Sequence, residues 1–237
     1  MNTKYNIEKW AEETVLGRRV FNYNFRLTAT EFKGWALIKT IALSTDRDNM
    51  ETAYFFENKK DPKREVVRVD ITERFSWFQA QSALQNELNG SMRPDIPNGT
   101  KDLARLGDVS FVTRQPESDY PTAISFVRGN VLILINFVGE KKSDMAGIAV
   151  QIDDTLSKVP TAAQMKKGKI HRLKPQPSNK KINGVYDLID LTKRVKSKTW
   201  LQIIASDGEL SRKGNVIIYK PETQGTNQVD VYEHSRD

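Results

Sequence analysis

The chain has 237 residues, 38% of them hydrophobic, so it can bury a sizeable core in one or two domains. It contains no cysteine and only two histidines, which excludes thiol catalysis and iron–sulfur ligation and leaves too few ligands for a conventional zinc site. We therefore expect no metal and no cofactor. The formal charge of +7 is concentrated in segment 166–200, which holds eleven Lys or Arg against two acids, whereas the remainder has 26 basic and 28 acidic residues.

The first third of the chain is dominated by strand-like segments. Weak helical periodicity at 1–19 is followed by strands predicted at 20–27, 35–43, 52–56 and 67–72. The segment 35–43 also fits a buried helix, but the preceding Gly34 and the recurring Ile and Thr favour a strand. Val67, Val69 and Ile71 alternate with polar residues, which is typical of a half-exposed strand.

The clearest helix is predicted to begin at Ser76. Gln79 stands three residues later, as in a capping box, and Asn89-Gly90 supplies a stop signal. A loop over 91–106 and a strand over 107–112 follow.

The most apolar run, 123–138, is divided by Gly129-Asn130. Two β-rich arms around this turn signal predict an antiparallel hairpin at the centre of a sheet. Arg128 flanks the turn and Asp108 begins the preceding strand, so we expect an Arg–Asp contact that holds the turn.

A second helix is predicted from Ser143 to Pro160. Its apolar stripe has helical spacing and indicates a face packed on the sheet; the stripe consists of Met145, Ile148, Ala149, Ile152 and Leu156. Strands followed by a helix thus occur twice in succession, which suggests a βββα duplication. We predict an α+β domain over 1–160, in which an antiparallel sheet packs against two helices.

The composition changes after this domain. Residues 161–181 are Lys-rich and predict a basic linker, with 170–173 as the first edge strand of a second domain. Strands are predicted at 185–191, 199–205, 216–219 and 229–232. Short strands at this spacing predict a small all-β sandwich over 182–237.

This last segment resembles bacterial immunoglobulin-like repeats. The resemblance rests on Ala205-Ser206-Asp207-Gly208-Glu209-Leu210, on Tyr219-Lys220-Pro221, and on Gly225 followed by Val229-Asp230-Val231. It covers about a quarter of the chain and implies an Ig-like binding or structural module of secreted and cell-surface proteins. The first 160 residues are loosely similar to uncharacterised exported bacterial domains, a likeness that implies no activity.

No catalytic motif is recognisable: the chain has no nucleophile elbow, phosphate-binding loop or H-E-x-x-H. His171 and His234 are predicted to be surface residues. Asp153 and Asp154 lie about 100° apart on a helix and should not form one carboxylate pair. Segment 46–49 lacks the glycine and glutamate of a calcium loop and predicts a turn.

The basic stretch is the best candidate site. Its charged residues are Lys166, Lys167, Lys169, Arg172 and Lys174. They lack interleaved aromatic residues, so an electrostatic polyanion site fits better than base stacking, and nucleic acid is not the expected ligand. A solvated linker is the plain alternative.

Three functions therefore stay open: a non-enzymatic exported protein of interaction or envelope assembly, an enzyme or accessory domain acting on an anionic polysaccharide, and polyanion binding through 166–174. The first is favoured. No apolar run is long enough for a membrane span, and the N-terminus lacks the apolar core of a signal peptide. We expect an extracellular or periplasmic mature form, with a cytoplasmic protein left open, and a protein or anionic polysaccharide partner.

Overall fold

The computed structural model describes residues 7–27, 32, 34–46, 49–62, 64–90, 103, 106–114, 119–174, 181–182, 184–190, 198–225 and 227–235. Positions 47–48 of the predicted turn, most of the predicted loop 91–106 and residues 175–180 of the predicted linker lie outside these ranges. The helices are α1 (Ile7–Glu13), α2 (Val15–Arg18), α3 (Trp77–Gly90), α4 (Ala146–Ser157) and α5 (Ala162–Lys166). The strands are β1 (Val20–Tyr23), β2 (Trp35–Asp46), β3 (Asn49–Asn58), β4 (Val66–Glu73), β5 (Val109–Thr113), β6 (Ala123–Arg128), β7 (Val131–Phe137), β8 (Ile170–Leu173), β9 (Lys181–Ile182), β10 (Val185–Asp190), β11 (Thr199–Ala205), β12 (Glu209–Lys213), β13 (Val216–Lys220) and β14 (Val229–Ser235).

The largest sheet is built around the predicted central hairpin. Its six antiparallel strands follow the order β2-β3-β4-β7-β6-β5, and β7 pairs with β6 on one side and β4 on the other. Gly129 in the β6–β7 turn has φ 57°, a conformation that glycine adopts without steric cost. The predictions of this hairpin, and of a strand rather than a helix at 35–43, are confirmed.

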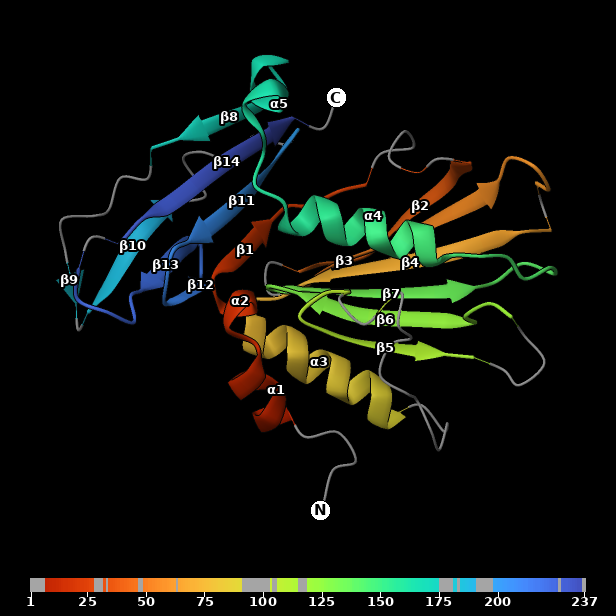
Figure 1. Ribbon diagram of the computed structural model, residues 1–237, viewed down its shortest axis with the longest axis horizontal. Helices are drawn as coiled ribbons and strands as arrows, with labels where there is room; N and C mark the ends of the chain where they lie inside the picture. Colours follow the sequence, from red (N-terminus) through yellow and green to blue (C-terminus); the bar gives the residue numbers. More distant parts are fainter. Residues whose placement is uncertain are drawn as a thin grey trace.

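Helices cover both faces of this sheet (Figure 1). Successive side chains of β7 point to opposite faces, so that Ile133 packs in the cluster containing α4 and Leu132 in the cluster containing α3. The whole predicted apolar stripe of the second helix is buried against the sheet. An uninterrupted apolar run suits β7 because both of its faces are buried.

The two remaining sheets have four strands each, in the orders β1-β11-β14-β8 and β12-β13-β10-β9. Side chains from both sheets form one hydrophobic cluster, in which Phe21, Leu201 and Val231 of the first sheet pack with Leu210 and Ile217 of the second. The first of these sheets includes β1 from the start of the chain and the predicted edge strand β8. Strand pairing therefore does not follow the predicted division at 160 and 182.

The β1-β11-β14-β8 sheet also contacts the core of the six-stranded sheet. Trp200 of β11 belongs to that larger core and meets Phe25 edge to face, with ring centroids 5.0 Å apart. The Asn130 side chain accepts a hydrogen bond from Asn22 N at 2.7 Å and donates to Asn22 O at 2.8 Å. One sheet is thus shared between two hydrophobic clusters.

The predicted α+β class is wrong, and the strands of 182–237 do not form a sandwich by themselves, because β1 and β8 join the sheet of β11 and β14. Among the described residues, 46% lie in strands and 23% in helices, and the strands form three antiparallel sheets. The protein is a β-rich fold with small helical parts. The sequence pattern predicted the strands individually, and β8 as an edge strand of the later sheet, but it could not show that β1 pairs with β11.

The two long helices begin differently from one another. Ser76 caps α3 as predicted, since its Oγ accepts a hydrogen bond from Gln79 N at 3.2 Å. Ser143 does not cap α4, which begins at Ala146 after Met145, and Asp144 Oδ1 accepts from Ala146 N at 2.8 Å. Among the described residues, no helix is both long and apolar enough to cross a bilayer.

Candidate functional site

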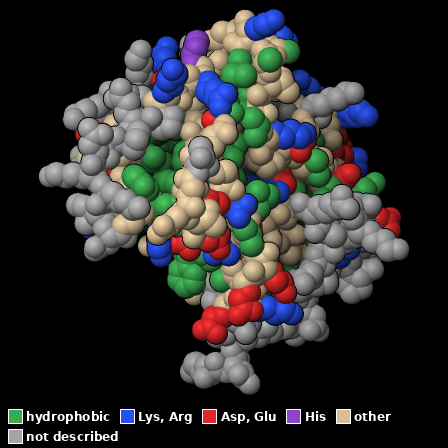
Figure 2. All heavy atoms as spheres, turned by 60° about the vertical axis from the view of Figure 1, so that its left-hand side comes forward, with side chains coloured by type: hydrophobic (Ala, Val, Ile, Leu, Met, Phe, Trp, Pro, Cys, Tyr) green, Lys and Arg blue, Asp and Glu red, His purple; other side chains and the backbone are tan. Residues whose placement is uncertain are grey.

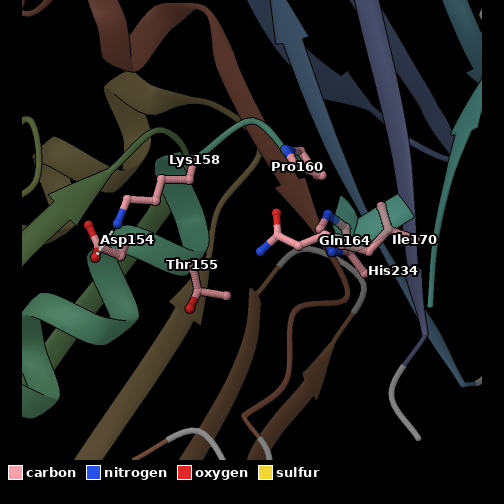
Figure 3. A pocket seen from close by; sticks show the side chains of 7 residues that line it. All are labelled: Asp154, Thr155, Lys158, Pro160, Gln164, Ile170 and His234. Atoms are coloured by element: carbon pink, nitrogen blue, oxygen red, sulfur yellow. Dashed lines mark hydrogen bonds and ion pairs between the residues drawn. The ribbon is translucent and has the colours of Figure 1, made fainter. Parts of the chain in front are cut away.

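A pocket of about 310 Å³ opens at the surface where the end of α4 meets α5, β8 and β14 (Figure 3). We call it the His234 pocket, and it is lined by Asp154, Thr155, Lys158, Pro160, Gln164, Ile170 and His234. Its walls combine aliphatic, amide, hydroxyl and charged groups. None of the five predicted site residues is among the lining residues.

His234 is held firmly in this wall. It lies directly opposite Trp200 in the β11–β14 register, and the two rings stack with centroids 3.8 Å apart at 12°. Burial lowers the pKa of His234 to about 4, so the imidazole is neutral near pH 7. His234 was predicted to be a surface residue; it is half-buried, because strand pairing brings it onto Trp200.

The hydrogen bonds around Gln202 define which ring nitrogen of His234 carries the proton. Gln202 Nε2 donates to the carbonyl of Leu156 at 3.1 Å, so Gln202 Oε1 is the atom that faces His234 Nε2, also at 3.1 Å. Because this oxygen can only accept, the neutral ring carries its proton on Nε2. His234 Nδ1 then bears a lone pair and acts as an acceptor.

Gln164 enters the pocket from the first turn of α5. It forms a capping box with Thr161, in which Gln164 Oε1 accepts from Thr161 N at 2.8 Å and Gln164 N donates to Thr161 Oγ1 at 3.3 Å. The box therefore engages the amide oxygen of Gln164 with Thr161. Figure 3 shows the amide of Gln164 directed toward Thr155.

The other polar groups in the wall are already engaged. Asp154 forms an ion pair with Lys158 four residues later on the same helix, and Thr155 Oγ1 donates to Gln151 O at 2.8 Å. The Thr155 oxygen keeps lone pairs for a further donor. The wall therefore offers both hydrogen-bond donors and acceptors with no net charge.

The predicted basic residues follow the pocket along the chain, and we call residues 166–174 the basic segment. Lys166 ends α5, Lys167 caps it, and Lys169 precedes β8; all are exposed. These three lysines lie on the connection between two lining residues, Gln164 and Ile170. Figure 2 shows Lys and Arg side chains gathered in the upper part of the molecule, where α5 and β8 lie.

The remaining two basic residues lie along the edge strand β8. Arg172 is ion-paired with Asp230 of β14; this hydrogen bond and the charge of Asp230 raise the pKa of Arg172. Lys174 follows the strand and is exposed. The structure therefore brings the five predicted residues to one edge, but Arg172 is already paired.

The buried ionic cluster beside the β6–β7 turn is a different kind of site. Arg128 forms two 2.7 Å hydrogen bonds to Asp153 and one of 3.0 Å to Asp108, whose other oxygen accepts from Gly129 N at 2.6 Å. Burial raises the pKa of Asp108, opposed by the charge of Arg128. The predicted Arg128–Asp108 contact is confirmed, and it fixes the turn against α4.

Two further predictions are confirmed by these contacts. Asp153 points to the buried Arg128 while Asp154 points to the exposed Lys158, so they do not form a carboxylate pair. His171 is exposed on β8. Within the described ranges, no group of three or more His, Cys, Asp or Glu side chains could hold a metal ion.

Comparisons with known proteins give no family for this fold: no family model, curated protein or solved structure shows significant similarity to the chain.

The His234 pocket was not predicted from the sequence. One local signal was present, since Thr161 and Gln164 have the spacing of a capping box inside the segment interpreted as a linker. The contact of His234 with Trp200 had no such signal, because it depends on the register of two strands far apart in the chain.

Proposed function

We propose that the protein is a non-enzymatic, exported binding protein that holds an anionic polymer on the basic segment beside the His234 pocket. The observation that carries this proposal is the position of Lys166, Lys167 and Lys169. They lie on the five-residue connection between Gln164 and Ile170, so positive charge and a concave surface occur together. Lysine side chains at a surface attract anionic polymers through counterion release.

The contacts in the pocket favour binding over turnover. Asp154 is paired with Lys158, and the Nε2 proton of His234 is donated to Gln202. A general acid or base needs a proton-accepting or proton-donating atom directed at the substrate with a pKa near the working pH. The pKa of His234, lowered by burial to about 4, makes it a weak base.

The exported location rests on the resemblance of the C-terminal quarter to bacterial immunoglobulin-like repeats. Fractionation of cells that express the native gene tests it. Recovery of the protein in the cytoplasmic fraction alone would remove this part of the proposal without affecting the anion site.

The anion site is tested by salt elution from immobilised heparin. In one variant Lys166, Lys167, Lys169 and Lys174 are replaced by Gln, and Arg172 is kept because Asp230 already neutralises it. We expect earlier elution, and a slope of log affinity against log salt that is smaller by up to about 3.5, since each of the four lost contacts removes a little under one from the slope.

The matched control replaces four exposed lysines elsewhere by Gln. These are Lys59, Lys60, Lys213 and Lys220, in or beside the strands β3, β12 and β13. The control removes the same net charge, so it should elute close to the unmodified protein. Equal shifts in the two variants would show that net charge, not the basic segment, causes retention, and would overturn the proposal.

A further inference from the structure

The size of the His234 pocket limits what it can hold. Its volume of about 310 Å³ lies at the lower end of the range of about 300–1,000 Å³ found for small-molecule sites. One water molecule occupies about 30 Å³ in the liquid, so the pocket has room for the equivalent of about ten waters. A single ring-sized unit fits, and a longer polymer would have to pass across the opening.

The two kinds of wall indicate the chemistry of that unit. Pro160 and Ile170 are apolar, and the His234 ring is neutral and backed by Trp200. The amide of Gln164 and the side chain of Thr155 complete the lining (Figure 3). A sugar ring has the matching character, because its C–H groups form an apolar face while its hydroxyls both donate and accept.

The capping box leaves one strong donor for this ring. Gln164 Oε1 is held by Thr161, so Gln164 Nε2 is the amide atom left for a ligand among the described contacts. Thr155 Oγ1 donates to Gln151 and keeps its lone pairs, so it accepts from a ligand hydroxyl. The lining therefore offers both a donor and an acceptor to the hydroxyls of one ring.

The charge beside the opening selects among sugars. Within the wall Asp154 and Lys158 cancel, whereas Lys166 and Lys167 add positive charge along the connection from Gln164 to Ile170. A neutral sugar would gain nothing from these lysines. A ring that carries an acidic group would gain a charge-assisted contact.

We propose that the His234 pocket binds one acidic sugar residue of a polysaccharide, with the ring between Ile170 and Gln164 and its acidic group toward the basic segment. This inference rests on the proposed function and names its ligand class. Carboxylate and sulfate share the required charge, so the experiment includes both.

The test is a titration of the full chain, followed by ¹H–¹⁵N NMR, with a trisaccharide of galacturonic acid, a sulfated trisaccharide and a neutral galactose trisaccharide. We expect saturable one-to-one binding of an acidic trisaccharide, with shifts at the Gln164 side-chain amide and the Ile170 and His234 backbone amides. The acidic compound that binds more tightly identifies the acidic group. The neutral trisaccharide should bind at least tenfold more weakly.

The decisive variant is Gln164→Glu. Glutamate keeps the capping box, because one carboxylate oxygen still accepts from Thr161 N, but it replaces the Nε2 donor by an acceptor. We expect an affinity at least tenfold lower than that of the unmodified protein. Gln224→Glu, at an exposed position away from the pocket, adds the same charge and should bind normally.

Each outcome separates this inference from the proposed function. Unchanged binding by Gln164→Glu, equal binding of the neutral sugar, or no binding of any trisaccharide overturns the sugar pocket. If heparin retention still depends on the four lysines in that case, the proposed function stands alone. If the lysine variant and its control elute alike, the proposed function fails whatever the titration shows.

Discussion

Replacing Arg128 by Met tests whether the buried ionic cluster fixes the central hairpin. The side chains of Arg128, Asp108 and Asp153 are 8%, 1% and 11% exposed, so removing the guanidinium leaves two carboxylates in a largely water-free site. Loss of one partner from a buried ion pair costs about 3–5 kcal/mol, and we expect Arg128→Met to lose that much of the free energy of unfolding at pH 7.

Two comparisons separate this explanation from simple loss of packing. The triple variant Arg128→Met, Asp108→Asn, Asp153→Asn carries no charge in the site, so it should recover at least half of the loss. Burial raises the pKa of Asp108, and in the single variant this carboxyl also loses the opposing charge of Arg128. The destabilisation from Asp108 is therefore complete above its raised pKa and is relieved as the pH falls through that value, so the loss should be smaller at pH 5 than at pH 7.

The assay is urea unfolding monitored by tryptophan fluorescence at both pH values, with the slope against urea used to check that the transition stays two-state. A loss below about 1 kcal/mol for Arg128→Met would mean that water reaches the carboxylates, since exposed pairs contribute no more than this. A triple variant no more stable than the single one would show that unpaired charge is not the cause.

Three further results are expected. For His234, burial lowers the folded pKa to about 4 from 6.5, so the unfolded chain takes up the proton first as the pH falls; stability should decline between about pH 6.5 and 4 by roughly 2 kcal/mol after allowance for partial exposure. His234→Phe should not show this loss of stability. The prediction would be contradicted if urea unfolding gave the same change in stability between pH 6.5 and 4 for both proteins. Gly129→Ala places a Cβ 2.6 Å from Val20 O at φ 57°, so the free energy of unfolding should fall by at least about 2 kcal/mol. At Gly147 an added Cβ meets no atom within 4 Å, so Gly147→Ala should be neutral or stabilise α4 by up to about 1 kcal/mol. Thermal melts of the two variants compare these effects. Phe25→Ala removes the edge-to-face partner of Trp200 and should lower the free energy of unfolding by about 3–5 kcal/mol in the same urea assay. A loss under about 1 kcal/mol would contradict a core shared between the sheets.

Local patterns in the sequence predicted most individual elements of the fold. The run 123–138 and its Gly129-Asn130 turn identified the central hairpin because both signals are contained within a few residues. The stripe of α4 was likewise visible from its spacing. The start of α4 was predicted wrongly at Ser143, since the composition of a capping signal does not show which of several neighbouring polar residues accepts the first hydrogen bond.

Long-range pairing could not be predicted, and the fold class was wrong for that reason. A strand of four residues such as β1 carries no local information about its partner, and β1 pairs with β11 across most of the chain. The same limitation applies to the site. The charges of the basic segment are visible in the sequence, but the pocket beside it requires the register that aligns His234 with Ile170 and Trp200.

The pairing of β1 with β11 has a consequence for how the chain is made. Val20 lies opposite Ile204, so β1 leaves the ribosome about 180 residues before its neighbour, a delay of roughly 10 to 40 s at the usual speed of translation. During that time the backbone of β1 has no edge to join. The sheet of β1, β11, β14 and β8 therefore joins segments about 180 residues apart in the chain, and a nascent chain stopped before β11 would keep β1 unpaired.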